Sequence, residues 1–309
     1  MSTSAKQLFF SLLLLFTAAV WGSGFLVMQD VQEIVPINYV LAVRFSVAAL
    51  GLVYFVYADR ANFGWDKIWQ GIVTGGLIYL AYWVQSYGLY FTTVSNNAVL
   101  CALYVVMVPF LVWFVRKQSL SWRIYASAFT CLLGVVLVAA PNGMDKINSG
   151  DALALTSSFL YALHMVVVSI YSERTEVMSL TCLQFAFAGL FAFIVASFGK
   201  PWPQHLEPSA YYSLAWLSVM ATLMAITMMN IGIKYVSSSK TAIILSTESV
   251  FACIFGVIFK DEPITANLVV GVVLVFVAMV ASQLEPSKEG KRNKAEILRA
   301  NSNTLKATA

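Results

Sequence analysis

Charged residues are scarce in this sequence. Asp, Glu, Lys and Arg make up 11% of the 309 residues, against roughly 25% in a typical soluble domain, while 60% of the chain is hydrophobic. The few charges gather in short breaks between apolar runs of roughly 18 to 22 residues, which is the length that an α-helix needs to cross a bilayer. The composition therefore excludes a water-soluble domain and predicts a membrane protein whose partner is the lipid bilayer.

Residues that bind metals or form disulfides are also few. The only histidines are His164 and His205, and none of the cysteines belongs to a C-x-x-C motif. The cysteines all lie inside apolar runs and are predicted to be small packing residues: Cys101, Cys131, Cys182 and Cys253. The sequence also lacks a G-x-x-x-x-G-K-[ST] phosphate loop, and its loops are too short for a nucleotide-binding domain. We expect no metal site, no cofactor and no ATP-driven pump.

The net charge of +4 could suggest a nucleic-acid partner, but its position argues against one. Of the 19 Lys and Arg residues, six lie from Lys288 onward, in a segment with few apolar residues. This composition predicts a disordered cytoplasmic basic tail over residues 285–309, close to anionic lipid. No nucleic-acid binding is expected.

The stretch 88–139 occurs twice in the chain. Shifting the sequence by 144 positions aligns it without a gap on 232–283, so that Gly88 falls on Gly232 and most apolar positions fall on apolar positions. Each copy consists of a polar turn, an apolar run, a polar break and a second apolar run. This pattern is typical of a duplicated membrane protein.

The apolar runs predict ten transmembrane helices, five in each copy. We expect them at 8–28, 37–57, 68–90, 97–115, 122–140, 152–171, 178–198, 210–230, 241–259 and 264–284. An odd number of spans in each copy places the two copies in opposite orientations, and inverted repeats are typical of secondary transporters. The predicted fold is therefore an all-α membrane protein of two inverted five-helix repeats, covering residues 1–143 and 144–284.

The distribution of Lys and Arg predicts the orientation. With the N-terminus inside, the inner segments before the tail hold nine of these residues, and the outer loops hold only Lys146, Lys200 and Lys260. Because cytoplasmic loops carry the excess of Lys and Arg, both termini are expected in the cytoplasm of a multi-pass protein of the cell (inner) membrane.

Several short motifs resemble those of one transporter family. They are Trp21-Gly22-Ser23, Arg44-Phe45 with Ala48-Ala49-Leu50, Gly150-Asp151-Ala152-Leu153-Ala154, Glu248-Ser249-Val250-Phe251 and Asp261-Glu262-Pro263-Ile264-Thr265. In this order and spacing they resemble the EamA branch of the drug/metabolite transporter superfamily. The resemblance covers all ten expected helices and implies transport of amino acids, amines, sugars or other metabolites without naming the cargo.

Two departures from the family pattern bear on gating and specificity. The first copy has Lys117-Gln118 where the second has Asp261-Glu262. Ser249 stands where the family usually has proline after the glutamate.

Three residues with ionisable His, Arg or Glu side chains lie well inside the expected spans: Arg44, His164 and Glu248. A charge near the middle of a bilayer costs several kcal/mol, roughly 2.5 to more than 10, so each is expected to face a wet cavity or a partner. Arg44 and Glu248 differ in expected depth by about 10 Å, which suits a cargo held between them. The alternative is a structural role for each. His164 could relay protons or could be a neutral histidine bonded to a neighbouring helix.

Aromatic residues are the other candidates for a substrate site. Tyr79, Tyr82, Trp83 and Tyr87 recur at helical spacing in the expected third helix, while their counterparts in the second copy are not aromatic. One wall of the cavity is therefore expected to be aromatic and the other aliphatic, at Leu223, Ile226, Thr227 and Ile231. Three further residues could complete the aromatic wall: Trp21, Tyr104 and Tyr161. Positions that face lipid are the alternative.

Together these features favour a secondary transporter of small amino acids or amines. The central cavity is expected between helices three, four, eight and nine, flanked by one and six. Glu248 is the candidate proton carrier, because burial disfavours the charged form of a carboxyl group. A uniporter for another metabolite, with Glu248 paired to a neighbour such as Lys240, is the alternative. An intramembrane enzyme lacks support, because no nucleophile with its base is evident. Both a monomer and a homodimer are compatible with the sequence.

Overall fold

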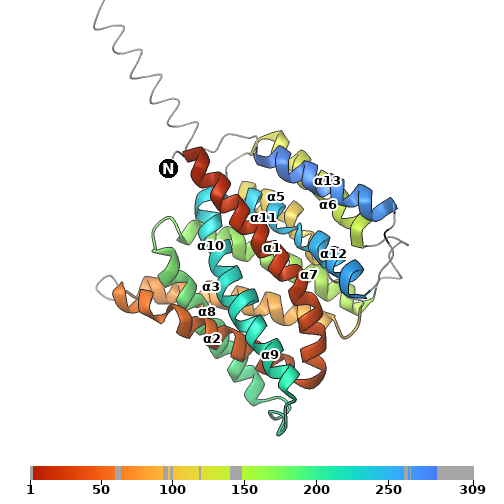
Figure 1. Ribbon diagram of the computed structural model, residues 1–309. Helices are drawn as coiled ribbons and strands as arrows, with labels where there is room; N and C mark the ends of the chain where they lie inside the picture. Colours follow the sequence, from red (N-terminus) through yellow and green to blue (C-terminus); the bar gives the residue numbers. More distant parts are fainter. Residues whose placement is uncertain are drawn as a thin grey trace, which may run out of the picture.

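The computed structural model describes residues 3–59, 64–92, 97, 100–117, 120–139, 148–260, 264 and 266–283. All regular elements within these ranges are helices (Figure 1). The predicted tail over 285–309, the link between the halves at 141–147, Gln118 and the Asp261-Glu262-Pro263 motif lie outside the described residues.

The helices follow one another along the chain with short connections. They are α1 (Thr3–Ile34), α2 (Ile37–Ala58), α3 (Trp65–Gly88), α5 (Tyr104–Arg116), α6 (Trp122–Ala139), α7 (Ser149–Tyr171), α8 (Val177–Ser197), α9 (Pro208–Trp216), η2 (Leu217–Met224), α10 (Ala225–Val236), α11 (Ser238–Leu245), α12 (Glu248–Lys260) and α13 (Ala266–Gln283).

Among the described residues, five helices are long and apolar enough to cross a membrane. They are Ala5–Ile34, Ile37–Ala58, Ser149–Tyr171, Val177–Ser197 and Pro208–Val236. Three shorter apolar helices accompany them, at Tyr104–Arg116, Trp122–Leu137 and Val269–Ser282. The fold is that of a helical protein with several membrane spans.

The expected eighth span is longer than predicted and is not a regular α-helix. It runs without interruption from Pro208 to Val236, but its middle part, η2, is π-helical. The hydroxyl of Thr222 donates to the carbonyl of Leu217, five residues earlier, at 2.7 Å. The hydropathy pattern from which the span was predicted does not distinguish a π-helical segment from a regular α-helix.

The expected ninth span is broken into α11 and α12. The hydroxyls of Ser246, Thr247 and Ser249 each donate to the carbonyl three residues earlier, at 2.7 to 2.9 Å. Such side-chain bonds compete with the regular helical ladder. The break leaves Glu248 as the first residue of α12.

Helices from the two halves interleave. Helix α2 packs along α8, α6 along α13, and α3 against α7 and α8 (Figure 1). Gly75 permits one close approach, because a Cβ there would lie 2.7 Å from the carbonyl oxygen of Gln184 on α8. Gly22 of α1 permits another, because its Cβ would lie 2.7 Å from the Cβ of Phe251 on α12. A Cβ at Gly24 or Gly76 would make only ordinary contacts.

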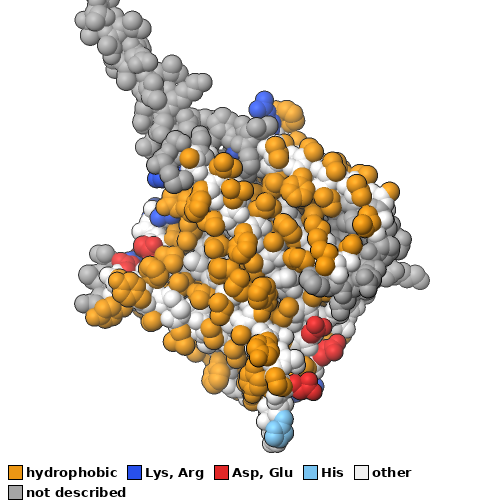
Figure 2. Space-filling model, viewed as in Figure 1, with side chains coloured by type: hydrophobic (Ala, Val, Ile, Leu, Met, Phe, Trp, Pro, Cys, Tyr) orange, Lys and Arg blue, Asp and Glu red, His pale blue; other side chains and the backbone are white. Residues whose placement is uncertain are grey.

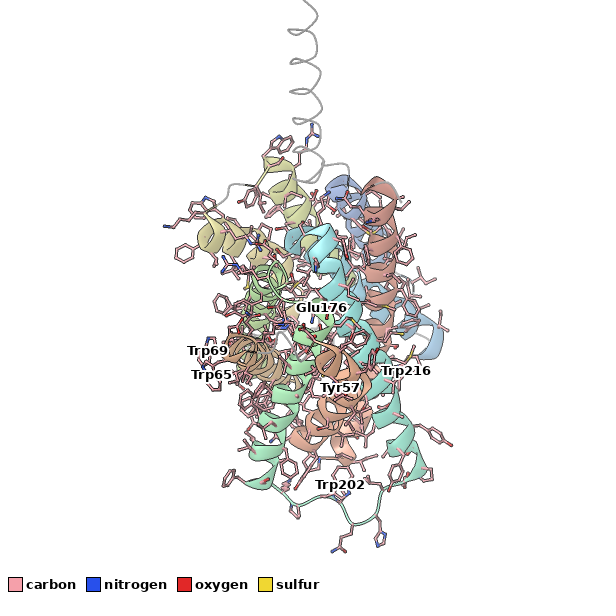
Figure 3. All side chains as sticks on the ribbon, turned by 90° about the vertical axis from the view of Figure 1, so that its left-hand side faces the viewer. Tyr57, Trp65, Trp69, Glu176, Trp202 and Trp216 are labelled. Carbon is pink, nitrogen blue, oxygen red and sulfur yellow. The ribbon has the colours of Figure 1, made fainter. Side chains whose placement is uncertain are left out.

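The outer surface is largely apolar. Figure 2 shows hydrophobic side chains over most of the visible face, with Lys and Arg gathered near the N-terminal end of α1 and most Asp and Glu near the opposite edge. Trp65 and Trp69 project from the bundle, 73% and 54% exposed, and Trp202 lies in the connection between α8 and α9 (Figure 3). This distribution is typical of a surface that faces lipid, with aromatic side chains near its borders.

Candidate functional site

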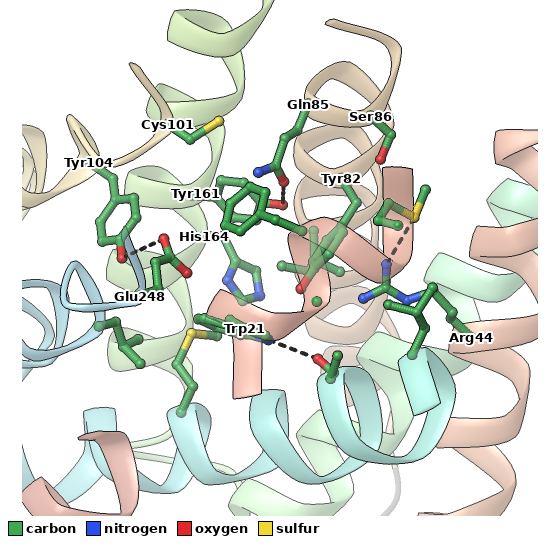
Figure 4. A pocket seen from close by; sticks show the side chains of 18 of the residues that line it. Trp21, Arg44, Tyr82, Gln85, Ser86, Cys101, Tyr104, Tyr161, His164 and Glu248 are labelled. Carbon is green, nitrogen blue, oxygen red and sulfur yellow. Dashed lines mark hydrogen bonds between the residues drawn. The ribbon is translucent and has the colours of Figure 1, made fainter. Parts of the chain in front are cut away.

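One cavity lies in the interior of the bundle and brings together residues from both halves. Its walls come from α1, α2, α3, α5, α7, η2, α10, α11 and α12 (Figure 4). Seven of the nine residues predicted for substrate binding line it: Trp21, Arg44, Tyr82, Tyr104, Tyr161, His164 and Glu248. Helices α1 and α7 therefore line the cavity directly, whereas the sequence analysis predicted that these two helices would only flank it.

Glu248 supplies the acidic group of the cavity. Its side chain is 7% exposed, and Oε1 accepts a hydrogen bond of 3.3 Å from the hydroxyl of Tyr104. Because Glu248 begins α12, the amide groups of the helix N-terminus favour a negative charge there. The carboxylate thus has a hydrogen-bond donor and a helix dipole beside it, and neither of the ion pairs among the described residues involves it.

Arg44 supplies the basic group on another side of the cavity. Its Nε donates to the hydroxyl of Thr222 on η2 at 2.9 Å, and its guanidinium lies 4.7 Å from the ring centroid of Tyr82. A weaker contact of 3.8 Å joins Nη1 to Met28 Sδ. The ring face of a tyrosine attracts a cation, which offsets part of the cost of burying the charge.

The two charged groups do not pair with each other. The ion pairs among the described residues are Lys67–Asp59 at 2.6 Å and Arg116–Glu173 at 2.7 Å. Figure 4 shows Glu248 and Arg44 at opposite sides of the cavity, with the rings of His164 and Tyr82 between them. The two charged groups therefore lie apart, and each has a neutral hydrogen-bond partner.

The π-helical segment η2 accepts hydrogen bonds from two cavity residues on other helices, Trp21 and Arg44. The indole Nε1 of Trp21 donates to the carbonyl of Ala221 at 2.8 Å, and the neighbouring Thr222 binds Arg44. In a regular α-helix the carbonyl of residue 221 would serve the backbone ladder, and π-helical turns are common at functional sites because they alter this pattern. Leu217 and Ala221 of η2 also line the cavity.

His164 bonds to a neighbouring helix. Its Nε2 lies 3.0 Å from Oε1 of Gln184 on α8, and its side chain is fully buried. Of the two interpretations given to this residue, the structure shows the hydrogen bond to a neighbouring helix. The contact does not exclude a role toward a solute, because His164 also lines the cavity.

Sequence reasoning missed several cavity residues. The amide oxygen of Gln85 accepts a hydrogen bond of 2.6 Å from Tyr161, and Cys101, Met165 and Met229 complete parts of the wall. Gln85 could have been found as an uncharged polar residue inside an apolar run, one helical turn beyond Tyr82. Cys101, Met165 and Met229 give no such signal, because cysteine and methionine are also common in hydrophobic cores.

Two predicted site residues lie outside the cavity lining. The hydroxyl of Tyr79 donates to Asn38 at 3.3 Å, and Trp83 stacks on Tyr87 with ring centroids 5.5 Å apart. The α3 residues that line the cavity are Ile78, Tyr82, Gln85 and Ser86, which recur on one face of the helix. Tyr79 and Trp83 each lie one residue further along, so that they are turned by about 100° from this face.

The expected aliphatic wall also differs from its prediction. Leu223, Ile226, Thr227 and Ile231 do not line the cavity, and Leu217, Ala221 and Met229 occupy that side instead. Leu223 and Thr227 are the counterparts of Tyr79 and Trp83, which also lie outside the lining, whereas Met229 is the counterpart of the cavity residue Gln85. The 144-residue offset therefore holds between Gln85 and Met229, and the prediction failed because it started from the aromatic positions of α3.

These features define a class of protein. A bundle of apolar helices with an interior cavity, lined by an acid, a base and aromatic rings, is the architecture of a membrane protein that handles a small solute within the bilayer. The EamA-like transporter family model matches this chain twice, over residues 8–140 and 148–282. The chain belongs to this family and is a membrane transporter, not an enzyme.

Proteins similar in sequence to this chain are also named as transporters. An uncharacterized transporter of Archaeoglobus fulgidus is 28% identical over 90% of this chain and 87% of its own length. The uncharacterized transporter YcxC of Bacillus subtilis is 20% identical over 88% of this chain and 91% of its own length. A protein of known crystal structure shares the fold with a TM-score of 0.74 at 14% identity, covering 91% of this chain and 98% of the other.

Proposed function

We propose that this protein is a secondary active transporter of small amino acids or amines. The observation that carries the proposal is the single cavity in which Glu248 and Arg44 lie apart, each held by neutral partners and each facing the same space. A zwitterionic solute matches two separated opposite charges, and an amine matches the acidic side alone.

The cavity chemistry suggests how such a cargo is held. An ammonium group would lie near Glu248, and a carboxylate could form a bidentate pair with the guanidinium nitrogens of Arg44. The rings of Trp21, Tyr82 and Tyr161 offer faces for an apolar side chain or for the cation. An uncharged sugar could form hydrogen bonds with these groups but would supply a counter-charge to neither.

The proposed architecture is ten membrane spans in two inverted repeats, over residues 1–143 and 144–284. Helix α12 begins and ends 144 residues after α5, and α13 begins and ends at the same offset from α6. Tyr104 and Glu248 are counterparts at this offset and also touch each other. Two equivalent residues in contact lie close to the axis that relates the copies, which supports a two-fold axis through the cavity.

This architecture supports alternating access with both termini in the cytoplasm. In this scheme the two halves rock about the cavity, and the contacts of α2 with α8 and of α6 with α13 rearrange as they do so. The basic tail over 285–309 would then lie at the cytoplasmic surface of the cell (inner) membrane. Both monomer and homodimer fit this scheme.

Proton exchange is the proposed energy source. Glu248 would bind either a proton or the ammonium group of the cargo, so that the two compete for one carboxylate. The hydroxyl of Tyr104 can donate to the ionised form and accept from the protonated form. A uniporter in which Glu248 keeps its charge throughout the cycle is the competing mechanism.

Reconstituted vesicles distinguish these mechanisms. A thermal-shift screen of amino acids and amines on purified protein first selects a ligand, because binding to the folded state raises its apparent stability. An imposed pH gradient should then drive uphill accumulation of that ligand by the wild type and not by Glu248→Gln. Glu33→Gln, which removes an exposed acid at the end of α1, serves as the control and should behave as the wild type. Equal gradient-driven accumulation by wild type and Glu248→Gln would exclude Glu248 as the proton carrier.

A further inference from the structure

Behind His164 lies a line of polar side chains that takes no direct part in the cavity wall. It consists of Gln184 and Thr181 on α8 and Asn230 on α10, and all three are fully buried. Buried polar groups in a membrane bundle are costly unless they bond to one another, so their arrangement fixes which atoms donate and which accept.

The direction of these hydrogen bonds follows from a backbone carbonyl at the far end. The hydroxyl of Thr181 donates to the carbonyl of Val177 at 2.7 Å, and that carbonyl can only accept. Because this bond uses the only hydroxyl hydrogen, the Thr181 oxygen must accept from its other neighbour, Asn230. The atom of Asn230 at 3.0 Å from Thr181 is accordingly the amide nitrogen Nδ2.

The same reasoning continues to His164. Nδ2 of Asn230 lies 3.3 Å from Gln184, so the Gln184 atom there must be the accepting oxygen Oε1. This oxygen lies 3.0 Å from Nε2 of His164, so Nε2 must carry the hydrogen of that bond. In a neutral imidazole with hydrogen on Nε2, the other nitrogen, Nδ1, carries a free lone pair.

Nδ1 has no partner among the described residues. It is buried, and the ring that carries it lines the cavity, between Glu248 and Tyr82 in the view of Figure 4. A buried acceptor without a donor is unfavourable, whereas the same acceptor beside a cavity is satisfied when a bound solute supplies an N–H or O–H group.

We propose that Thr181, Asn230 and Gln184 are positioning residues that hold His164 with its hydrogen on Nε2, so that Nδ1 accepts a hydrogen bond from the transported solute. The site then selects solutes with an N–H or O–H donor, such as primary amines, over quaternary ammonium compounds of equal charge. The identity of the solute as an amine rests on the proposed function, whereas the form of the imidazole does not.

Nitrogen NMR tests the form of the imidazole without any ligand. The chain has two histidines, so His205→Gln leaves His164 as the only signal in protein labelled with ¹⁵N-histidine and purified through a histidine-free tag. In lipid nanodiscs we expect the hydrogen on Nε2 and a non-protonated Nδ1. Gln184→Met removes the acceptor and should produce a mixture of the two tautomers. Gln32→Met, which removes another buried side-chain amide on α1, should leave the spectrum unchanged. Hydrogen on Nδ1 in the wild type, or no change in Gln184→Met, would overturn the positioning role.

A pair of probes tests the donor requirement. 2-Phenylethylamine and its N,N,N-trimethyl derivative carry the same charge and ring, but only the first has N–H donors. We expect the wild type to bind the first more tightly and His164→Phe to lose roughly three- to tenfold of that preference, the range of a single hydrogen bond. An unchanged preference in His164→Phe would refute the contact to Nδ1. If neither probe binds the wild type while the NMR result holds, the amine assignment is wrong and the positioning role stands.

Discussion

At the scale of single residues, the site is built from charges held by neutral partners. Arg44 illustrates the point, because its Nε is bonded to a threonine hydroxyl and its plane lies against a tyrosine ring. If Arg44 were paired with a carboxylate of the protein, its guanidinium N–H groups would already be occupied and could not bind a solute. Apart from the weak contact of Nη1 with Met28, Nη1 and Nη2 have no carboxylate partner among the described residues, and the bond of Nε to Thr222 helps to hold the guanidinium in place.

The role of Thr222 can be tested by removing only its hydroxyl. Thr222→Val should weaken binding of L-phenylalanine by roughly threefold to tenfold, because Arg44 loses one hydrogen bond that orients it. Binding of 2-phenylethylamine, which has no carboxylate, should change much less. Thr222→Ser retains the hydroxyl and is the control. Equal weakening for both ligands, measured by titration calorimetry, would contradict a role confined to Arg44.

At the scale of helices, close contacts between the halves depend on glycine. Gly22 lies against the first turn of α12, where a Cβ would approach the amide nitrogen of Ala252 to 2.8 Å and the carbonyl oxygen of Glu248 to 2.9 Å. Because these are backbone atoms, α1 and α12 would have to separate to admit a methyl group.

Gly22→Ala is therefore expected to destabilise the protein by about 1–3 kcal/mol through overpacking. Gly24→Ala is a matched control, because a Cβ at Gly24 would lie 3.8 Å from the nearest atom, an ordinary contact. Thermal unfolding in detergent should show a lower midpoint for Gly22→Ala and little change for Gly24→Ala. Equal midpoints for both variants would show that α1 and α12 are not closely packed in the purified protein.

At the scale of the whole molecule, the proposed topology predicts which loops face outward. Cysteine substitutions at Asn148 and Gln204 should react with a membrane-impermeant thiol reagent added to intact cells, and substitutions at Asn62 and Ser302 should not. The native cysteines Cys101, Cys131 and Cys182 are buried, and a wild-type sample measures any background from them and from Cys253. Reaction at Ser302 from outside would refute a cytoplasmic C-terminus.

A cross-link tests the proposed motion. Joining α5 to α12 through engineered cysteines near the cavity should slow transport, since the two halves must move relative to each other during alternating access. Two cysteines within α12 provide a control that does not join the halves. Transport at full speed with α5 and α12 linked would refute rocking of the halves.

The sequence alone determined the class of the protein, because hydropathy and helix length are local properties that one chain displays directly. It identified a membrane transporter of the EamA-like family, and the family match confirms that prediction. It also singled out Arg44, His164 and Glu248, since burying an ionisable group among apolar helices is too costly without a polar cavity or partner. The structure places all three at one cavity.

The tertiary structure decided which faces and partners complete the site. Tyr82 and Gln85 line the cavity while Tyr79 and Trp83 do not, because the rotation of α3 is set by packing against α7 and α8 and its own pattern of aromatics fits several rotations. Thr222 forms a hydrogen bond with Arg44, which is 178 positions away in the sequence. Gln184 on α8 forms one with His164 on α7. Such contacts depend on how the helices pack against one another. No local sequence pattern contains this information, and none predicts the π-helical segment that carries Thr222.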